Sequence, residues 1–300
     1  MVLGVVVWGM FGMFCQKLHS LYLRGIINHK SIKMKNVILK LLFISLFISC
    51  GEQRQASQEE PKGIMWFNEN PLHREIIIEG IRHFENIEFE KAYVYFEKAI
   101  RLDSTLFAPH VMLASLSRPN SEQQEYHYER AKKLVQDKNE NSKRFVSLLD
   151  IKNESGKRNM LGRGEKTKIW DAMIKDAPNG PFIQVYHAWS RTTLEERIEA
   201  LENLLSKRKE SGEINNGHIL NALGYSYMQS GDLDKAKSFF EEYIESYPSG
   251  YNPYDSMGEF YFLQKDYENA KIYYEMALNI FPAANSANKK LKEINTLNIE

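Results

Sequence analysis

Cysteine is nearly absent from this chain of 300 residues, which contains only Cys15 and Cys50. Neither cysteine has the C-x2-C neighbour that is typical of a structural metal site. Both lie in or beside apolar N-terminal segments. The sequence therefore gives no support to a disulfide framework or to a cysteine-ligated metal.

Clusters of basic residues are also lacking beyond residue 50. The whole chain has 39 Lys and Arg against 39 Asp and Glu, but residues 1–50 hold six of the basic residues and none of the acidic ones. The remainder therefore carries 33 basic and 39 acidic residues, a net charge of −6. Binding to nucleic acid needs clustered Lys and Arg to displace counterions from phosphates. We therefore expect no nucleic-acid partner.

Catalytic and metal-binding motifs are missing too. The sequence contains no H-E-x-x-H, no G-x-S-x-G, no phosphate-binding loop and no dinucleotide-binding glycine run. Its later histidines have no paired ligand spacing and are interpreted as helical residues: His73, His83, His110, His127, His187 and His218. The chain is therefore expected not to be an enzyme, with no catalytic residue, no cofactor and no metal.

Two apolar stretches open the chain. The first, residues 1–14, falls short of the roughly 20 apolar residues that a membrane span needs. The second begins at Met34 with basic residues, continues with an apolar core and ends at Cys50, which is the pattern of a secretory signal peptide. The residues before the cysteine, Leu46-Phe47-Ile48-Ser49, resemble a bacterial lipobox, although Phe47 stands where the family has Leu. The resemblance implies cleavage before Cys50 and lipid attachment to its thiol.

These segments set the expected division of the chain. Residues 34–49 are interpreted as a lipoprotein signal peptide. The polar residues 50–63 are interpreted as a flexible tether, because they hold almost no apolar side chain to bury. An uncleaved membrane anchor and a cleaved signal without lipid remain alternatives. Residues 1–33 fit no signal peptide, and we favour a translation start at Met34 over a short membrane hairpin. Residues 64–300 are expected to form a repeat domain.

Two segments near the C-terminus repeat with a period of 34 residues. Equivalent positions hold a bulky residue, an apolar residue before a Gly, a Tyr, an Ala, an aromatic residue and a Pro. They are Leu220, Leu223, Gly224, Tyr227, Ala236, Phe240 and Pro248 in the first segment, and Tyr254, Met257, Gly258, Tyr261, Ala270, Tyr274 and Pro282 in the second. This pattern resembles the tetratricopeptide repeat, which implies antiparallel helical hairpins stacked into a right-handed solenoid.

Physical chemistry supports the pattern independently. Gly224 and Gly258 each cost about 1 kcal/mol inside a helix, which is tolerable where a larger side chain would keep two helices apart. Between the helices of each hairpin, Asp232 and Asp266 stand where they can cap the second helix. The sequence therefore predicts two closely packed helical hairpins.

Weaker copies upstream extend this to an all-α fold of about six hairpins and a C-terminal capping helix. The first copy keeps the small and aromatic positions at Gly80, Ala92, Phe96 and Ala99, with a turn at residues 86–88. The remaining helices are expected over residues 109–116, 121–135, 143–153, 164–175, 182–190 and 194–207, with residues 285–297 as the cap.

The family resemblance also implies a binding groove. Four positions of each first helix line the concave face in that family. In the two clear repeats these are His218, Asn221, Tyr225, Met228, Asn252, Asp255, Glu259 and Phe262, and in the preceding hairpin Phe182, Val185, Trp189 and Thr192. Aromatic residues and Met commonly anchor interfaces. The alternative is that these side chains pack against neighbouring helices. The Lys and Asn pattern with which some family members hold a C-terminal carboxylate is absent.

The expected function is protein binding in the bacterial cell envelope. The chain is expected to be lipid-anchored, facing the periplasm or the cell surface, and to act as an adaptor or scaffold that holds a protein or peptide partner in its groove. One alternative is a subunit of an outer-membrane assembly machine, which would share the lipobox and the repeats. Another is a receptor for a small molecule or glycan, in which Tyr and Trp would stack on sugars.

Overall fold

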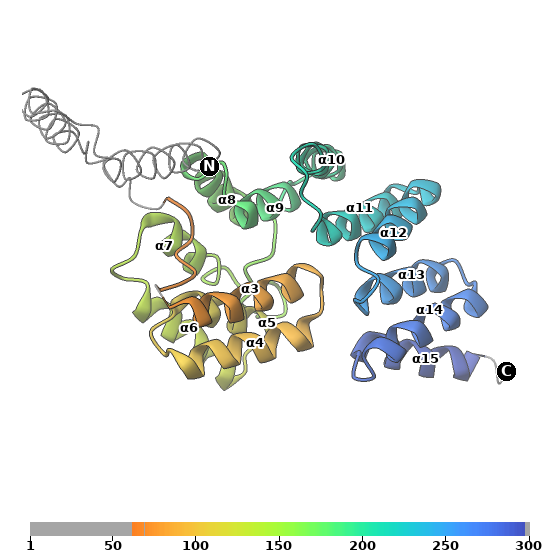
Figure 1. Cartoon of the computed structure of the whole chain (residues 1–300), viewed down its shortest axis with the longest axis horizontal. Helices are drawn as coiled ribbons and strands as arrows, with labels where there is room; N and C mark the ends of the chain where they lie inside the picture. Colours follow the sequence, from red (N-terminus) through yellow and green to blue (C-terminus); the bar gives the residue numbers. More distant parts are fainter. Residues whose placement is uncertain (1–61, 69, 298–300) are drawn as a thin grey trace, which may run out of the picture. The chain divides into compact units, whose positions relative to one another are not determined.

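The computed structural model describes residues 62–68 and 70–297, and the regular structure of this part is helical (Figure 1). Thirteen helices follow one another in it. Their bounds are α3 Pro71–Glu85, α4 Phe89–Leu102, α5 Phe107–Leu116, α6 Glu122–Leu134, α7 Glu140–Ser147, α8 Glu165–Asp176, α9 Pro181–Trp189, α10 Leu194–Glu210, α11 Gly217–Ser230, α12 Leu233–Ser246, α13 Asn252–Leu263, α14 Tyr267–Ile280 and α15 Asn285–Leu297. The only pairing of extended backbone in the described part is an isolated bridge between Lys152 and Arg158. The predicted all-α fold is confirmed.

The predicted signal peptide, Cys50 and most of the predicted tether lie outside the described residues. Within residues 62–68 and 70–297, no helix has the length and apolar character needed to cross a membrane.

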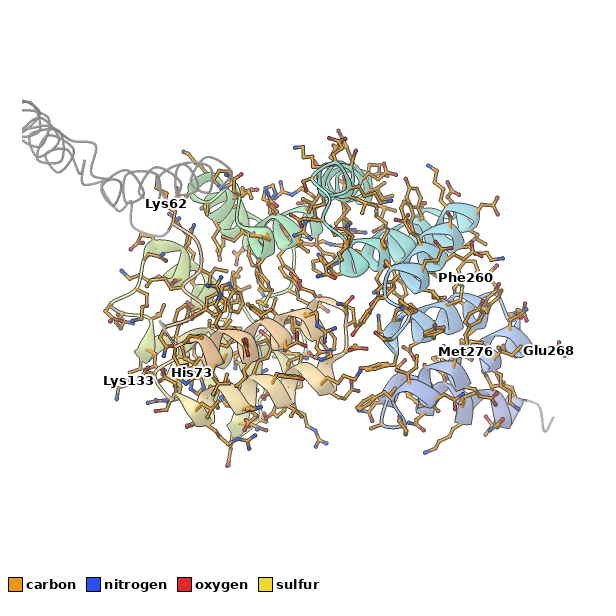
Figure 2. The ribbon with its side chains drawn as sticks, viewed as in Figure 1. Lys62, His73, Lys133, Phe260, Glu268 and Met276 are labelled. Atoms are coloured by element: carbon orange, nitrogen blue, oxygen red, sulfur yellow. The ribbon has the colours of Figure 1, made fainter. Side chains whose placement is uncertain are left out.

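Helices that follow one another in sequence pack together. Hairpins form from α3 with α4, α5 with α6, α9 with α10, α11 with α12 and α13 with α14, and α15 packs on α14 as the predicted last helix. Their apolar faces form the core, so that Phe260 is 3% exposed while Met276 and Glu268 are exposed (Figure 2). The structure is therefore a solenoid of helical hairpins.

Three of these hairpins share one close contact between their helices. In each, a glycine of the first helix lies against an aromatic ring of the second. A Cβ atom added to the glycine would lie 2.8 Å from the ring of Phe96 at Gly80, 2.5 Å from Phe240 at Gly224 and 2.8 Å from Tyr274 at Gly258. Each pair is flanked by a fully buried alanine on the second helix, Ala92, Ala236 and Ala270. The predicted first copy, α3 with α4, is confirmed.

The turns of these hairpins are equivalent as well. Ile87, Gly231 and Lys265 have φ of 60°, 86° and 63°, in the left-handed region that residues with a Cβ rarely adopt. Asp232 and Asp266 accept hydrogen bonds from the backbone N–H groups of the second helices, as predicted. The turn of the first hairpin thus has a left-handed residue at the same place as the other two turns, but not their capping Asp.

The helix predicted over residues 143–153 is wrong in its second half. Helix α7 ends at Ser147, and residues 148–164 run as irregular structure to α8. Gly156 has φ of 78°, which closes a turn between the bridged Lys152 and Arg158. The backbone N–H of Met160 donates to Ser115 Oγ at 3.1 Å, so this segment is held by α5 rather than by a helical ladder. Helix α5 also starts at Phe107 instead of Pro109, because Pro is tolerated in a first turn.

Candidate binding groove

The turn of the first hairpin contacts the C-terminal hairpins, far away in sequence. Tyr243 Oη donates to the carbonyl of Asn86 at 3.1 Å, and Arg82 Nη1 donates to Tyr247 Oη at 3.1 Å. Glu90 accepts hydrogen bonds from the Tyr251 hydroxyl and, at 3.0 Å, from Asn285 Nδ2. We call the residues that make these contacts, together with Glu88, the turn junction. Its members are Arg82, Asn86, Glu88, Glu90, Tyr243, Tyr247, Tyr251 and Asn285.

Glu88 lies at the centre of the turn junction with no exposed surface. Its carboxylate accepts from Tyr251 N at 2.9 Å and from Tyr247 Oη at 3.1 Å, and it lies 2.6 Å from His83 Nδ1 and 3.2 Å from Lys91 Nζ. Burial alone would raise the pKa of Glu88, but the hydrogen bonds and the charge of Lys91 outweigh it and leave that pKa below its usual value. A buried, ionised carboxylate therefore joins the first hairpin to the loop before α13.

Two cavities adjoin where the turn faces the C-terminal hairpins. The first has a volume of about 380 Å³ and lies between this turn, residues 161 and 163, and α9, α10 and α11. The second has a volume of about 350 Å³ and lies between the same turn, α11, α13 and the start of α15. Four residues line both cavities: Ile87, Phe89, Asn221 and Tyr225. We call the two the apolar cavity and the acidic cavity, and together they form the groove.

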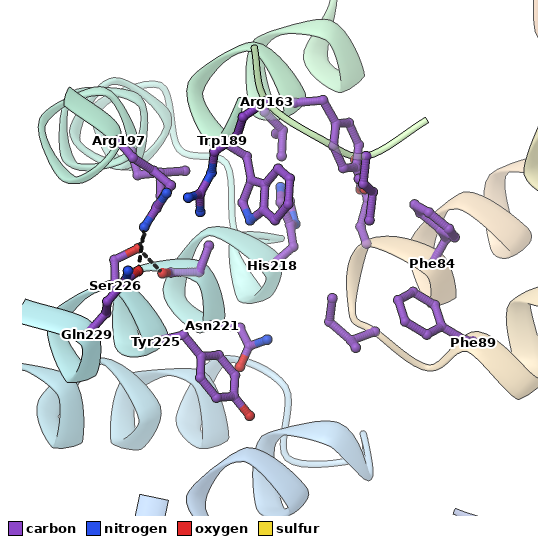
Figure 3. A pocket seen from close by; sticks show the side chains of 17 residues that line it. Phe84, Phe89, Arg163, Trp189, Arg197, His218, Asn221, Tyr225, Ser226 and Gln229 are labelled. Carbon is purple, nitrogen blue, oxygen red and sulfur yellow. Dashed lines mark hydrogen bonds between the residues drawn. The ribbon is translucent and has the colours of Figure 1, made fainter. Parts of the chain in front are cut away.

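Aromatic and aliphatic side chains make most of the wall of the apolar cavity. Trp189 of α9 faces it from one side and Phe84 and Phe89 of the first hairpin from the other (Figure 3). Near Trp189 stand two guanidinium groups, Arg163 with its Cζ 5.8 Å from the indole centroid, and Arg197 of α10. Such a wall favours an apolar group over a strongly hydrated one.

Arg197 is buried without an acidic partner in the described part of the chain. It is 3% exposed, and its Nη2 donates to Gln229 Oε1 at 2.8 Å while its Nε donates to Ser226 Oγ at 3.3 Å (Figure 3). Its Nη1 has no hydrogen-bond partner there. Burial and the nearby charge of Arg163 lower the pKa of Arg197.

Glu85 lines the same cavity. Burial raises its pKa to about 7, although the positive charge of Arg208 acts in the opposite direction.

Three carboxylates line the acidic cavity: those of Glu90, Asp255 and Glu259. Glu259 accepts from Tyr225 Oη at 2.6 Å, but none of the three forms an ion pair with a Lys or Arg within residues 62–68 and 70–297. Asp255 is 6% exposed, and burial raises its pKa to about 6. The charges of Glu259 and Glu90 raise this pKa further, whereas a hydrogen bond from Ser286 lowers it. The acidic cavity therefore places two further carboxylates near the buried carboxylate of Asp255.

The structure brings six of the eight predicted groove residues into this groove. His218 lines the apolar cavity, Asn252, Asp255 and Glu259 line the acidic cavity, and Asn221 and Tyr225 line both. Burial, together with the charge of Arg208, lowers the pKa of His218 to about 3.

The other predicted positions lie elsewhere. Met228 is partly buried and packs against the core. The ring centroid of Phe262 lies 5.5 Å from that of Tyr267 and 3.9 Å from Lys290 Nζ. In the preceding hairpin, Val185 and Trp189 line the apolar cavity and Thr192 lines neither cavity, whereas Phe182 packs between Trp66 and Tyr186.

Sequence reasoning missed the opposite wall of the groove, which the first hairpin supplies. One signal could have indicated it. The turn of the first copy has Ile87, whereas the clear repeats have Gly231 and Lys265 at the same place. An apolar side chain in an exposed turn suggests a contact with another part of the chain.

Two segments of the chain, residues 217–249 and 251–283, match the model of the tetratricopeptide repeat. They correspond to α11 with α12 and α13 with α14, and the hairpin of α3 with α4 shares their glycine contact and turn geometry outside the matched residues. Comparison with curated proteins finds no match.

Several solved structures match the chain at low identity. PilW, described as a widely conserved type IV pilus biogenesis factor, is 12% identical with a TM-score of 0.40, covering 74% of this chain and 99% of its own. The MamA protein is 14% identical with a TM-score of 0.33, covering 69% and 91%. The pilF protein of Pseudomonas aeruginosa is 13% identical with a TM-score of 0.33, covering 75% and 91%.

Proposed function

We propose that this chain is a membrane-anchored adaptor of the bacterial cell envelope that holds a segment of a partner protein in the groove. The observation that carries the proposal is the pair of adjoining cavities of about 380 and 350 Å³ with four shared lining residues. An extended peptide advances about 3.3 Å per residue, so a short segment reaches from one cavity to the other. Tetratricopeptide hairpins are rigid, which keeps the entropic cost of binding low.

Photo-crosslinking from the groove tests this proposal. A benzoylphenylalanine placed at Trp189 keeps an aromatic body in the wall of the apolar cavity and reacts with whatever occupies it. The matched control places the same amino acid at Tyr126 of α6, an aromatic residue that is 56% exposed and lines neither cavity. In native membranes we expect discrete polypeptide adducts from position 189 that are missing from position 126.

The products separate the alternatives. Identical adducts from both positions, or no adduct from position 189, would refute the groove as a protein-binding site. A stoichiometric set of envelope proteins would favour a subunit of an assembly machine. A glycan or small-molecule adduct in place of a polypeptide would favour a receptor.

Lipid anchoring through Cys50 belongs to the same proposal and rests on the lipobox-like sequence before it. In a lipoprotein-processing host, the protein should incorporate labelled palmitate, and Cys50→Ser should abolish the label while Cys15→Ser leaves it. A chain that starts at Met34 should reach the same membrane fraction as the long one. Absence of label from the unsubstituted protein would refute the anchor without touching the groove.

A further inference from the structure

The acidic cavity holds acceptor atoms that nothing in the described part of the chain satisfies. Asp255 Oδ1 and Asn221 Oδ1 are both buried without a hydrogen-bond partner, and their residues are 6% and 5% exposed. Both residues line the cavity, Asp255 from α13 and Asn221 from α11. A buried acceptor without a donor destabilises the folded state, and here this happens at two neighbouring places. Asn221 is uncharged, so the need for a donor is independent of the acidic cluster.

The missing donor has a defined chemistry. Glu90 and Glu259 line the same cavity and add negative charge. The nearby donors of Tyr251 and Asn285 are used on Glu90, and that of Tyr225 is used on Glu259. In the described part of the chain, no group of three or more His, Cys, Asp or Glu side chains is arranged to hold a metal ion. A group with several N–H donors and a positive charge meets these conditions, since it pairs with carboxylates and satisfies neutral acceptors at once.

The surroundings favour a cation carried on an apolar stem. The rings of Phe89, Tyr225 and Tyr251 line the acidic cavity together with Ile87. Aromatic faces attract ammonium and guanidinium groups, and aliphatic stems pack on apolar side chains while the charged head stays among polar groups. Phe89, Ile87, Asn221 and Tyr225 also line the apolar cavity, so a ligand bound in one cavity contacts the wall of the other.

We propose that the acidic cavity binds the cationic side chain of a lysine or arginine residue of the partner segment, while a neighbouring apolar side chain of that segment enters the apolar cavity. This inference rests on the proposed function and names the chemistry of its partner.

Small probes test the cation directly on the full-length protein. n-Butylguanidinium and n-butylammonium represent the ends of arginine and lysine, and neutral n-butylurea has a similar shape without the charge. Ligand-observed NMR titration should give saturable binding of at least one cation, with a dissociation constant on the order of millimolar for so small a ligand. The butylurea should bind at least about tenfold more weakly, because it forms no charge-assisted hydrogen bond. The order of the two cations distinguishes an arginine-binding from a lysine-binding site.

A pair of variants places the binding at the cavity. Asp255→Asn should weaken cation binding about tenfold or more, whereas Asp234→Asn, on the exposed first turn of α12, should leave it unchanged. Asp255→Asn should also raise the urea midpoint at pH 8, because it removes a buried carboxylate that has no cationic partner. A purely structural role of Asp255 would move that midpoint in the opposite direction. If Asp255→Asn loses its helical circular dichroism, Glu259→Gln serves for the same comparison.

The pH dependence supplies a further readout. The groups that face Asp255 come from every element around it: Glu259 of its own helix, Glu90 of α4, Tyr225 of α11, Tyr251 directly before α13, Tyr274 of α14 and Ser286 of α15. Burial raises its pKa to about 6, so Asp255 is ionised at pH 8 and mostly protonated at pH 5. Cation binding should therefore weaken as the pH falls through 6, and Asp255→Asn should flatten that change.

Three results would overturn the inference: equal binding of butylurea and the cations, unchanged binding in the Asp255 and Glu259 variants, or no saturable binding of either cation. Each would leave the crosslinks from position 189 as they are, so the failure of this inference can be told from the failure of the adaptor function.

Discussion

The carboxylate of Glu88 offers a sharp test of the turn junction. Glu88 has no exposed surface and accepts from Tyr251 N and Tyr247 Oη while it lies beside His83 and Lys91. Glu88→Gln keeps the shape but removes the charge, and it replaces one acceptor oxygen by an NH2 group. One of the buried donors then faces another donor. Because breaking a buried, hydrogen-bonded ion pair costs about 3–5 kcal/mol, we expect a destabilisation of that order.

The control lies on the same hairpin. Glu79 pairs with Arg82 at 2.6 Å, but its side chain is 40% exposed, and exposed pairs contribute about 0–1 kcal/mol. Glu79→Gln should therefore shift the urea midpoint far less, measured by circular dichroism at 222 nm. The pH dependence has a definite sign. The pKa of Glu88 is lowered on folding, so its contribution is present above the usual Glu value of about 4.3 and is lost as the pH falls below it. Equal midpoints for the two variants would refute the role assigned to Glu88.

Two more predictions concern the core. Gly224→Leu should cost roughly 1–3 kcal/mol in urea unfolding, because even a Cβ there would lie 2.5 Å from the Phe240 ring. Lys237→Leu on α12, where the lysine side chain is 44% exposed, should cost much less, and equal costs would mean that the helix register is wrong. Burial, with the charges of His127 and Arg130, lowers the pKa of His110 to about 3. Unfolding therefore takes up a proton below pH 6.5, and the free energy of unfolding should fall from there by up to about 1.4 kcal/mol per pH unit. His110→Gln should flatten that slope, and an unchanged slope would contradict the role of His110.

Local sequence patterns were enough to predict the hairpins and their turns. The period of 34 residues, the Gly224 and Gly258 contacts and the capping Asp residues all depend on neighbours within one or two helices. For the same reason the helix predicted over residues 143–153 was wrong beyond Ser147. Its apolar residues fit a helical period, but the turn at Gly156 and the bond from Met160 to Ser115 hold that segment in another conformation. A contact with a distant helix overrides a weak local preference.

The groove was predictable only on the side that the clear repeats supply. Its positions on α11 and α13 follow from the repeat period, since the family resemblance fixes which face of a first helix is concave. The wall opposite depends on contacts such as that between Asn86 and Tyr243, which lie far apart in sequence. No period relates these residues, because the turn junction occurs once in the described part of the chain and has no equivalent in the two C-terminal hairpins. The unsatisfied oxygens of Asp255 and Asn221 likewise become visible only when their surroundings are known.

A single methylene group separates Glu88 from the Asp residues that stand at its place in the other two turns. Asp232 and Asp266 bend back and cap their own second helices, which makes those turns complete in themselves. Glu88 stands at the same place and makes no side-chain hydrogen bond to cap α4. Its longer side chain reaches Tyr247 and Tyr251 instead, and in doing so it fixes Ile87, Phe89 and Glu90 opposite α11 and α13. The residue that departs from the repeat at this turn is therefore the one that closes the groove, because a side chain that is not needed for its own hairpin is available to hold another.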